Sequence, residues 1–579
     1  MHTPSFPYTA IIRDGIRQNW LGFKDPLTTF QTSSLSEVRP LLDRAEAESK
    51  AGRYVVGLVS YEAGPAFDSA LTVSSSADFP LAWFAVFAEP EQLSALPAPP
   101  ESEPDPDLVP EVSRPQYLSD LATIRNHLAA GDTYQVNHTF RMRGRFPGHG
   151  YGLFHRLCTA RQGEYAAFVD LGRWSVLSTS PEMFFEKDGD EVLSRPMKGT
   201  VARSPVPDED LQRRDWLQAS EKNRAENVMI VDMVRNDLGR ICEPGTVVVP
   251  ELFAVEGYPT VWQMTSLVTG RTQASLSDIF TALFPASSIT GAPKSSTMEI
   301  IRDLEKSPRN IYTGTIGFLE PSGRARFNVA IRTVLVDREQ GLAECGVGGG
   351  IVWDSDPEEE YAECMTKAGF LKYSGPECSL LETMLWTREE GVHLLERHLD
   401  RLERSAVRFG VVMDREEIGE RIRKVTEVSD RDRGMVRVLV DMQGEVSVEM
   451  RPVPAPKERY VVALCREAVD PENLFLYHKT TRREIYDRAR ETHPDMDDIL
   501  LVNTRGELTE SCIANLVLDL DGELVTPPVS CGLLPGTARE ELLARGKVRE
   551  RVMTPEDLAR AARVLLVNSV RGMWEVEVV

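Results

Sequence analysis

A glutamate and a lysine flank a short segment whose pattern predicts a β-hairpin. Glu182 precedes this segment, and Lys198 follows it sixteen residues later. Asp188 and Gly189 predict a two-residue turn, and the register set by that turn places Glu182 opposite Arg195. The acid and the amine therefore reach the same end of a rigid element, where they could act on one substrate as general acid and nucleophile.

Two further acids stand on two separate predicted helices. Glu226 lies in the sequence AEN, and Glu363 lies in EYAE. Carboxylate oxygens are hard ligands of the kind that Mg²⁺ prefers, with water and an anionic substrate completing the coordination shell. Each acid also has a lysine one helical turn away, Lys222 or Lys367, and such a pair is worth only about 0.2–0.5 kcal/mol. We expect the two acids to bind metal.

Five stretches of the N-terminal part closely resemble the chorismate-utilising enzymes, in the order typical of that family. They are GDTYQVN (131–137), SPE with RPMKGT (180–200), AENVMIVDMVRNDLGR (225–240), SSITGAPK (287–294) and GGGIVWDSDPEEEYAECMTKA (348–368). The resemblance covers roughly residues 5 to 372. It implies a layered fold with large antiparallel sheets, like that of anthranilate synthase component I.

Lys198 indicates which branch of that family the chain resembles. Relatives that make anthranilate usually have alanine in the corresponding turn, whereas relatives that make 4-amino-4-deoxychorismate have lysine, as in RPMKGT here. The resemblance implies that the lysine amine adds to C2 of chorismate as the C4 hydroxyl leaves, and that ammonia then enters at C4. Only an uncharged amine can attack, so the site should lower the pKa of Lys198. Glu182 is the matching acid for the departing hydroxyl.

The resemblance also implies a set of residues that hold the substrate. Glu226 and Glu363 would bind a Mg²⁺ that holds the ring carboxylate of chorismate. Arginine can grip a carboxylate with two parallel hydrogen bonds, and glycines let backbone N–H groups approach a ligand closely. The expected substrate-binding residues are Thr290, Gly291, Tyr312, Arg332, Gly348, Gly349 and Gly350.

Three positions depart from the family pattern. Gln263 stands in VWQMTS where many relatives have histidine, Asn227 replaces the histidine of AEH, and PASSITG replaces a more glycine-rich segment. Glutamine can donate a hydrogen bond but cannot titrate. An acid role at position 263 is therefore excluded, and Glu182 should carry the protonation.

The C-terminal part, about residues 378 to 579, resembles the class IV pyridoxal-phosphate enzymes, which include aminotransferases and aminodeoxychorismate lyase. The matching stretches are LLETMLW (380–386), HLDRLERSAVRFG (398–410), YHKTTRREIYD (477–487), GELTESCIANL (506–516), GLLPGTARE (532–540) and VNSVRG (567–572). The resemblance implies pyridoxal 5'-phosphate (PLP) as cofactor and a D-amino-acid-aminotransferase-like fold in two subdomains.

Within that resemblance, each residue has a role that PLP chemistry requires. Lys479 is the expected Schiff-base lysine, and Glu510 is the acid expected to face the pyridine nitrogen. Arg401 would hold the cofactor phosphate, although on its own it could simply pair with His398 on a helix. Gly536 and Thr537 would offer backbone N–H groups at a helix start, where an anion is welcome. Asn568 and Arg571 are further candidates on the substrate side.

The elements that must position these residues suggest a mixed α/β (α+β) protein in two parts. We expect a chorismate-binding domain over residues 1–375, with a proline-rich extended connection at 89–115. We expect a PLP domain over 376–579, with a small part at 376–451, a linker at 452–457 and a large part at 458–579. Apolar periodicity predicts helices at 116–132, 213–238 and 357–373, and one strand at 324–337.

Composition narrows the class of protein. The 579 residues carry a formal net charge of −23, which argues against binding to nucleic acid or anionic membranes. The eight cysteines include no CxxC pair, so a reduced, cytoplasmic setting is expected. No apolar run approaches the roughly 18 residues of a membrane helix, and the N-terminus has no signal-peptide pattern.

The resulting hypothesis is a bifunctional enzyme that converts chorismate and ammonia to 4-amino-4-deoxychorismate, and then, with PLP, to 4-aminobenzoate and pyruvate for folate biosynthesis. One alternative is an anthranilate-type synthase fused to an amino-acid aminotransferase. Another is a synthase fused to a class IV-like module without catalytic activity. The chain lacks a glutaminase motif, so a separate glutamine amidotransferase subunit or free ammonia should supply the nitrogen. Class IV relatives are often dimers, so a homodimer is a further expectation.

Overall fold

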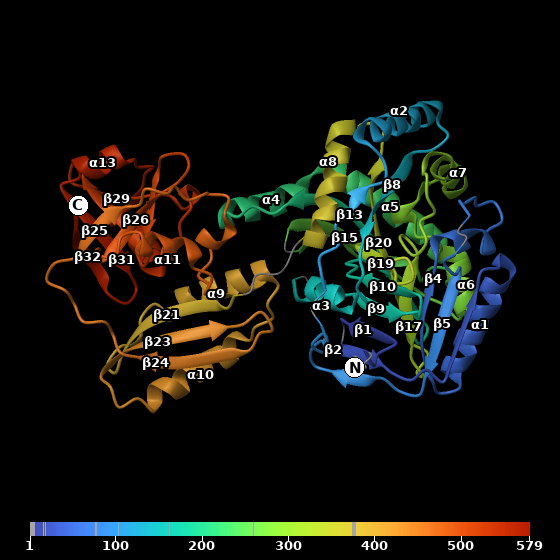
Figure 1. The fold of residues 1–579 in the computed structure, drawn as a ribbon, viewed down its shortest axis with the longest axis horizontal. Coiled ribbons are helices and arrows are strands. Elements are labelled where there is room, and N and C mark those ends of the chain that lie inside the picture. Colours follow the sequence, from blue (N-terminus) through green and yellow to red (C-terminus); the bar gives the residue numbers. More distant parts are fainter. Residues whose placement is uncertain are drawn as a thin grey trace. The chain divides into compact units, whose positions relative to one another are not determined.

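The structure is a computed structural model that describes residues 6–15, 17, 19–75, 78–101, 103–160, 163–258, 260–372 and 378–579. The chain forms two units (Figure 1). The first holds the described residues of 1–200, 217–256 and 263–375, and the second holds those of 201–216, 257–262 and 376–579. The expected boundary between residues 375 and 376 lies outside the described residues.

Two ten-stranded sheets, A and B, dominate the described part of the first unit. Sheet A contains β1 (Ala10–Asp14), β2 (Asn19–Phe23), β6 (Glu91–Leu93), β7 (Val109–Pro110), β8 (Gln135–Arg145), β9 (Ala167–Asp170), β10 (Trp174–Ser178), β16 (Gly291–Ala292), β19 (Thr333–Asp337) and β20 (Leu342–Ile351). Sheet B contains β3 (Thr28–Thr32), β4 (Tyr54–Val59), β5 (Ala82–Phe87), β11 (Met183–Asp188), β12 (Glu191–Arg195), β13 (Met197–Ala202), β14 (Val248–Gly257), β15 (Val261–Arg271), β17 (Thr315–Leu319) and β18 (Ala325–Asn328).

The sheets pack face to face because their strands are apolar on both sides. Successive side chains of a strand point to opposite faces. Val56 and Leu58 of β4 pack with Ile12 of β1 in the core between the sheets, whereas Val55 and Val59 of β4 face the helices outside sheet B. Both faces of sheet B are thus buried, as near-continuous apolar runs predict.

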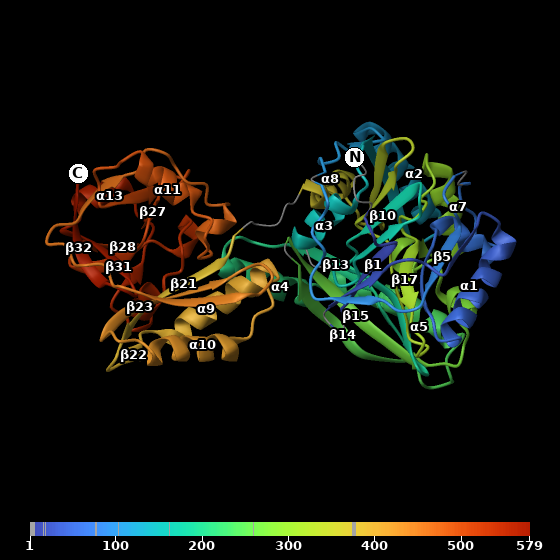
Figure 2. The ribbon, with the colours of Figure 1, turned by 60° about the horizontal axis from the view of Figure 1, so that its bottom comes forward.

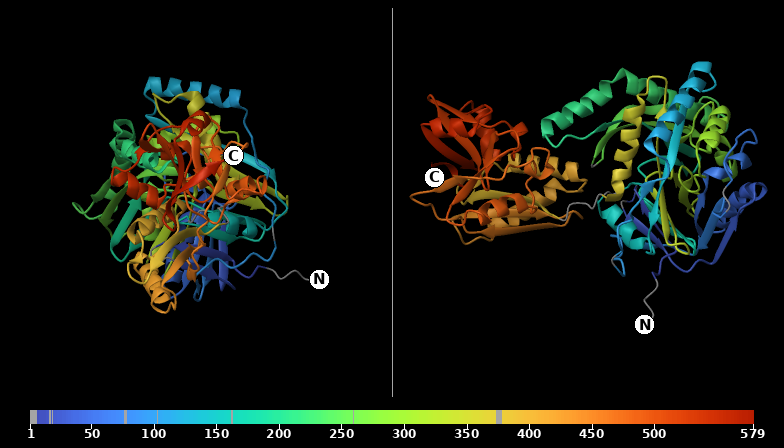
Figure 3. Two further views of the ribbon diagram at one scale, coloured as in Figure 1. Left: turned by 90° about the vertical axis from the view of Figure 1, so that its left-hand side faces the viewer. Right: turned by 45° about the horizontal axis from the view of Figure 1, so that its top comes forward.

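Helices cover the outer faces of the two sheets. Outside sheet B lie α1 (Leu35–Lys50), α5 (Glu221–Gly239) and α6 (Leu276–Leu283), and α1 and α6 run along β4 and β5 in Figure 1. Outside sheet A lie α2 (Arg114–Ala130), α3 (Tyr151–Ala160) and α8 (Pro357–Ala368), with α2 next to α8 (Figure 3). The remaining helical segments are α4 (Pro207–Ala219), α7 (Lys294–Leu304) and the 3₁₀ turns η1 (Tyr61–Ala66), η2 (Ser287–Ile289) and η3 (Gly369–Lys372).

The predicted helix at 116–132 is confirmed as α2. Ser113 caps its first turn by accepting a hydrogen bond from the Gln116 N–H at 3.4 Å, which satisfies one of the free donors at the helix start. Gly131 ends the helix in the left-handed conformation, with φ at 78°, which glycine adopts without steric cost.

The predicted register of the Glu182–Lys198 hairpin is wrong by one residue at its turn. Gly189 and Asp190 form the turn and Asp188 pairs with Glu191, because Gly189 takes the positive φ of 58° at the first turn position. A bulge between Met183 and Glu186 then shifts the pairing again, so Arg195 lies opposite Met183 and not opposite Glu182.

Two other predicted elements are each divided in the structure. The helix expected at 213–238 is two helices, α4 and α5, because Ser220 caps α5 by accepting a hydrogen bond from the Asn223 N–H. The strand expected at 324–337 is β18 in sheet B and β19 in sheet A. Between them Arg332 has φ at 48°, which interrupts an extended chain. In both cases local polar or backbone geometry overrides the apolar pattern.

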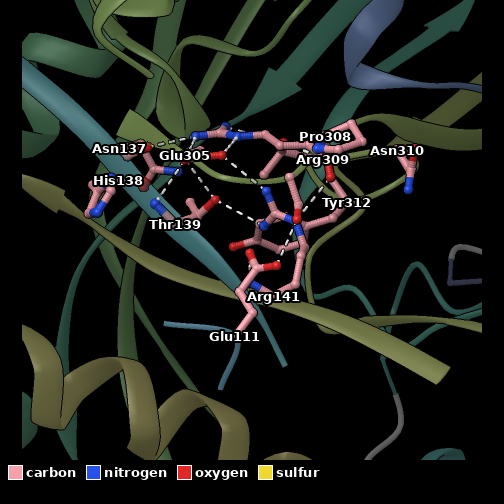
Figure 4. Close-up of polar contacts among 12 residues, drawn as sticks. Glu111, Asn137, His138, Thr139, Arg141, Glu305, Pro308, Arg309, Asn310 and Tyr312 are labelled. Atoms are coloured by element: carbon pink, nitrogen blue, oxygen red, sulfur yellow. Dashed lines mark hydrogen bonds and ion pairs between the residues drawn. The ribbon is translucent and has the colours of Figure 1, made fainter. Parts of the chain in front are cut away.

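A buried ion network joins β8 to the segment after α7 (Figure 4). The Glu305 carboxylate accepts hydrogen bonds from Arg309 Nε at 3.0 Å and Nη2 at 2.7 Å, and from Arg141 Nη2 at 3.0 Å. The Thr139 backbone N–H donates to the same carboxylate at 2.9 Å. Burial alone would raise the pKa of Glu305, but Arg309 and Arg141 lower it to about 2.

Arg309 also fastens the η2 turn to the sheet. Its guanidinium donates to the Ile289 carbonyl at 2.9 Å and to the Asn137 carbonyl at 2.7 Å. The Asn137 side chain donates to the same Ile289 carbonyl at 3.0 Å. These hydrogen bonds therefore anchor the segment from η2 to Gly291 to β8. The segment contains two of the expected substrate-binding residues, Thr290 and Gly291.

The C-terminal part of the second unit contains a small sheet with two helices and a larger, partly closed sheet. The small sheet has the order β22 (Gly391–Val392), β21 (Leu380–Thr387), β23 (Arg433–Val440) and β24 (Val446–Arg451). Leu399 of α9 (Leu395–Phe409) and Ile418 of α10 (Arg415–Glu427) pack in one core with Val436 of β23. Figure 2 shows both helices along this sheet.

The larger sheet closes into a small barrel. Its order is β27 (Leu508–Ser511), β26 (Asp498–Val502), β25 (Val461–Leu464), β32 (Gly572–Val578), β31 (Arg563–Asn568), β28 (Asn515–Leu520), β29 (Glu523–Thr526) and β30 (Arg549–Glu550), and β27 also pairs with β28. The accompanying helical segments are η4 (Leu474–Leu476), α11 (Glu484–Glu491), η5 (Val529–Cys531), α12 (Thr537–Ala544) and α13 (Pro555–Arg560). In the described part of the chain no helix is long and apolar enough to cross a membrane.

The ion network predicts how the first unit responds to loss of Glu305. Glu305→Gln leaves two buried arginines without their carboxylate, which should lower the free energy of unfolding by about 3–5 kcal/mol at pH 7. The pKa of Glu305 is lowered by folding, so its contribution to stability is present above the ordinary pKa of about 4.3 and is lost as pH falls toward 2.

The measurement is thermal and urea unfolding of both proteins between pH 7 and pH 3. Glu299→Gln is the matched control, because Glu299 lies on α7, the helix that ends just before Glu305. Its side chain is exposed, so the change should alter stability by less than about 1 kcal/mol. Equal stability of the Glu305→Gln and Glu299→Gln proteins would contradict the network's role.

Candidate active sites

Lys198 of β13 projects its amine against the backbone of β20. A Cβ atom built on Gly350 would collide with Lys198 Nζ, so only glycine leaves room for the amine at this point. Burial lowers the pKa of Lys198 below its ordinary value, and the nearby Lys367 acts in the same direction, although Glu226 opposes them. The lowered pKa increases the fraction of the lysine that is present as the uncharged, nucleophilic amine.

Gln135 lies beside the same glycine and was not predicted as a site residue. Its Nε2 atom is 2.9 Å from the Cβ position built on Gly350. The side chain is fully buried, and neither its Nε2 nor its Oε1 has a hydrogen-bond partner among the described residues. Burial of an amide without hydrogen-bond partners costs free energy. This side chain therefore has a donor and an acceptor available for a ligand. The only signal in the sequence was its place in the GDTYQVN stretch.

The turn that carries Lys198 is held by two neutral amides. Asn227 Nδ2 donates to the Lys198 carbonyl at 3.3 Å, and Gln263 Nε2 donates to the Gly199 carbonyl at 2.8 Å. Gln263 also accepts a hydrogen bond from Thr200 Oγ1 at 2.8 Å. These are the two positions where relatives often have histidine. Both amides therefore support the lysine turn without titrating.

Glu182 is buried within electrostatic reach of the lysine. Its Oε1 accepts a hydrogen bond from Ser288 Oγ of η2 at 2.7 Å. Burial raises the pKa of Glu182 to about 7, against the opposing effects of that hydrogen bond and of the Lys198 charge. The structure thus brings together the predicted acid and amine, and a substantial fraction of Glu182 carries a proton at neutral pH.

Three carboxylates from two helices lie within electrostatic reach of the lysine. Glu226 of α5, and Glu360 and Glu363 of α8, all act electrostatically on Lys198. Glu363 pairs with Lys367 at 2.7 Å, the alternative considered from the sequence, and Glu360 Oε2 lies 2.9 Å from the Cβ position built on Gly349.

These acids fit a magnesium ion that shares its coordination with substrate and water. No three acidic, histidine or cysteine side chains in the described ranges lie close enough to hold a metal by themselves. Mg²⁺ typically uses one or two protein carboxylates and completes its octahedron with water and ligand. Glu226 and Glu363 are the residues that would hold it, with Lys367 displaced from Glu363.

The other expected binders differ in how close they lie to the lysine. Gly348, Gly349 and Gly350 pair with β8, next to Gln135. Gly291 pairs with Val136 of β8, and Thr290 precedes it. The Tyr312 ring packs against Gly346, farther along β20 than the three glycines. The centre of this ring lies 5.2 Å from the Arg141 guanidinium carbon. Arg332, partly exposed, follows the Val329 segment whose backbone N–H donates to the Glu182 carbonyl.

A second candidate site is a cavity of about 360 Å³ in the C-terminal part. It brings together all five residues expected to bind PLP, which come from α9, from the loop before α11, from β27 and from the start of α12. They are Arg401, Lys479, Glu510, Gly536 and Thr537. Asn515, Asn568 and Arg571 line the same cavity.

The pKa values of Lys479 and Glu510 are both shifted toward neutral pH. Burial lowers the pKa of Lys479 to about 8, and the Arg401 charge acts in the same direction. Burial raises the pKa of Glu510 to about 7, although Tyr486 Oη donates to it at 2.8 Å and the Leu534 N–H at 3.1 Å. An amine and an acid with these properties fit the aldehyde and pyridine ends of PLP.

Arg401 is held in place by a buried carboxylate. Its Nε and Nη2 donate to Glu382, each at 2.8 Å, and its Nη1 donates to the Pro535 carbonyl at 3.0 Å. His398 hydrogen-bonds Glu382 at 2.6 Å and Thr537 Oγ1 at 3.2 Å. Three of the five guanidinium N–H groups are thus used, and two remain for the cofactor phosphate beside the α12 N-terminus.

Comparison with known families agrees with this division into two sites. The model of the chorismate binding enzymes matches residues 10–373, so the chain belongs to that family. Residues 379–579 match the family of class IV amino-transferases. The predicted mixed α/β fold class is confirmed, with large antiparallel sheets in the first part and a class IV fold with a small barrel in the second.

Part of the chain is similar in sequence to known members of the first family. A stretch of 258 residues is 43% identical to aminodeoxychorismate synthase component 1 of Klebsiella aerogenes, covering 44% of this chain and 57% of that protein. A stretch of 259 residues is 38% identical to an anthranilate synthase component 1 of Haloarcula marismortui, covering 44% and 53%. The chain thus spans just over half the length of these relatives.

A solved structure shares the fold of this part. Anthranilate synthase component I from Streptococcus pneumoniae has a TM-score of 0.54 and 22% identity, covering 64% of this chain and 93% of that one.

The lowered pKa of Lys479 predicts how the cofactor-free protein takes up PLP. Only the uncharged amine attacks the aldehyde, so the rate of uptake should rise with pH and level off above about 8, whereas an ordinary lysine would require about 10.4. The measurement is the growth of the visible absorbance band on mixing with PLP at pH 6 to 10. Lys479→Ala should show no band, and Lys547→Ala, which removes an exposed lysine of the same part, should behave as the parent. A band that persists without Lys479 would show that another lysine binds the cofactor.

Proposed function

We propose that this chain aminates chorismate at C4 in its N-terminal site and converts the product to 4-aminobenzoate and pyruvate in its C-terminal site. The observation that carries the first half is the burial of Lys198 and Glu182 within electrostatic reach of each other. The lysine lies on a turn where anthranilate-forming relatives usually have alanine. The similarity to aminodeoxychorismate synthase component 1 supports the same substrate and product.

In the first site, Lys198 Nζ forms a bond to C2 of chorismate while the bond between C4 and its hydroxyl oxygen breaks. Glu182 gives its proton to that oxygen, which leaves as water. Ammonia then forms a bond to C4, and the bond to Lys198 breaks, so the lysine is restored. Gln135 donates or accepts a hydrogen bond beside the reacting ring, and Thr290, Gly291 and Arg332 orient the carboxylates.

Magnesium would neutralise the ring carboxylate of chorismate and fix its orientation. Glu226 and Glu363 are the side chains that would hold the ion. Lys367 would then lose its pairing with Glu363 and keep its hydrogen bond to the Gly348 carbonyl, which is 3.0 Å long in the structure. The nearby carboxylates raise the pKa of Lys198 against the larger, opposite effect of burial.

In the second site, Arg401, Gly536 and Thr537 would hold the phosphate of PLP, and Glu510 would face its pyridine nitrogen. Bound through the substrate amine, PLP would acidify the hydrogen on C4 of aminodeoxychorismate. Lys479, as its neutral amine, would take that proton. The C3–O bond would then break, its electron pair would leave on enolpyruvate, and the ring would become aromatic.

We further propose that a separate glutamine amidotransferase subunit supplies ammonia, because the sequence contains no motif for glutamine hydrolysis. The chain can also be tested with free ammonium. The domain division proposed here places the first activity in residues 1–375 and the second in 376–579.

The first test is product identification with chorismate, Mg²⁺, ammonium and PLP. Lys198→Ala should reduce formation of aminodeoxychorismate by roughly 100-fold or more, a factor typical of positioned catalytic side chains, while supplied aminodeoxychorismate is still converted to 4-aminobenzoate. Lys187→Ala, which removes a lysine from β11 of the hairpin that precedes β13, is the matched control and should keep both steps. Full turnover by Lys198→Ala would exclude covalent catalysis, and release of 2-aminobenzoate by the parent protein would favour the anthranilate-type alternative.

The second test separates the metal from the cofactor. EDTA should stop the amination of chorismate and spare the conversion of supplied aminodeoxychorismate, because the proposed metal ligands belong to the first site alone. Glu226→Gln and Glu363→Gln should each raise the Mg²⁺ concentration for half-maximal amination by roughly tenfold or more. Glu359→Gln removes an exposed acid from α8 and should leave it unchanged. Equal loss of both steps in EDTA would contradict this assignment.

A further inference from the structure

The C-terminal cavity is strongly basic in a strongly acidic protein. The chain carries a formal net charge of −23, yet six of the seven Arg, Lys, Asp and Glu side chains that line this cavity are cationic. The six are Arg401, Arg437, Lys479, Arg483, Arg490 and Arg571, and the seventh is Glu510. Such a concentration of one sign of charge attracts ligands of the opposite sign.

Two of these cations are poorly compensated by protein carboxylates. The nearest carboxylate oxygen to Arg437 is on Glu449, at 3.9 Å, and the buried Arg437 Nε has no hydrogen-bond partner in the part of the chain that the structure describes. Arg571 has no ion pair there, and its guanidinium lies 5.5 Å from the ring centres of Tyr460 and Trp574. By contrast, Arg401 pairs with Glu382 at 2.8 Å and Arg490 with Asp498 at 3.5 Å.

Arg437 and Arg571 come from neighbouring elements. Arg437 of β23 pairs with Thr383 of β21 across the small sheet, and both residues line the cavity. The Thr383 carbonyl in turn accepts a hydrogen bond from Ser569 Oγ at 3.4 Å, in the β31–β32 turn that leads to Arg571. The strand and the turn therefore meet at one wall of the cavity. The phosphate-binding residues belong to other elements, α9 and the start of α12.

We propose that Arg437 and Arg571 form a carboxylate subsite that selects amine substrates carrying two carboxylates. The proposal rests on the proposed function, in which this cavity holds PLP and accepts aminodeoxychorismate. An arginine with a free N–H group can form charge-assisted hydrogen bonds to a carboxylate. Two such side chains on one wall are suited to an anion of two charges, whereas a substrate with one carboxylate leaves one guanidinium without an anionic partner.

The test uses isophthalate, a flat ring with two carboxylates and no amine, on the PLP-loaded full chain. Benzoate, with one carboxylate, is the comparison ligand. The visible absorbance of bound PLP reports binding in this cavity and not in the chorismate site. Isophthalate should bind at least about tenfold more tightly than benzoate, and its affinity should fall with ionic strength.

Three variants make the test specific. Arg437→Met and Arg571→Met should each raise the Kd of isophthalate by roughly 10- to 100-fold, the range expected for lost hydrogen bonds between charged groups. They should change the Kd of benzoate less and keep the PLP band. Arg433→Met removes an exposed arginine from the same strand, outside the cavity lining, and should leave both constants unchanged.

The outcomes separate this proposal from the proposed reaction. Unchanged isophthalate affinity in both variants would overturn the subsite, as would loss of the PLP band, because the arginines would then serve the cofactor. Equal affinity of the parent protein for benzoate and isophthalate would also overturn it. If the variants weaken isophthalate binding but the parent protein releases no 4-aminobenzoate from aminodeoxychorismate, the subsite stands and the proposed reaction fails.

Discussion

Removal of a lysine and a glutamate from water is the constraint on which both candidate sites depend. In water the lysine would be an ammonium, which cannot act as a nucleophile. The glutamate would be a carboxylate, which has no proton to donate. Burial lowers the pKa of Lys198 and raises that of Glu182 to about 7. The same cause lowers the pKa of Lys479 to about 8 and raises that of Glu510 to about 7. In both sites burial thus shifts the pKa of an amine down and the pKa of an acid up, each toward the neutral range.

Burial of this kind requires a rigid surrounding structure. In the first unit the two sheets pack face to face, and the Glu305 network fastens β8 to the η2 turn that reaches Glu182 through Ser288. In the C-terminal part Glu382 plays a similar role, because it holds both Arg401 and His398 beside the start of α12. Each site is therefore backed by a carboxylate that compensates buried cations and takes no direct part in the chemistry.

The neutral amides around Lys198 explain how the chain tolerates two departures from its family. Asn227 and Gln263 donate to consecutive carbonyls of the lysine turn. A histidine at either position could also bond these groups, but its charge would change near neutral pH. The amides do not titrate, so their hydrogen bonds to the turn do not depend on a change of charge, and Glu182 is left as the proposed acid.

The sequence by itself identified the candidate residues of both sites, because Lys198, Glu182, Lys479 and Glu510 lie in short stretches whose local pattern is specific. It also determined the fold class and helix α2, whose cap and stop signals are local. The tertiary structure decided what depends on distant contacts. Gln135 acquires a role only because β8 runs beside β20, and the Arg141–Glu305–Arg309 network joins residues up to 168 positions apart. The hairpin register, the break at Ser220 and the division of residues 324–337 between two sheets followed from single hydrogen bonds and positive φ angles, which apolar periodicity does not encode.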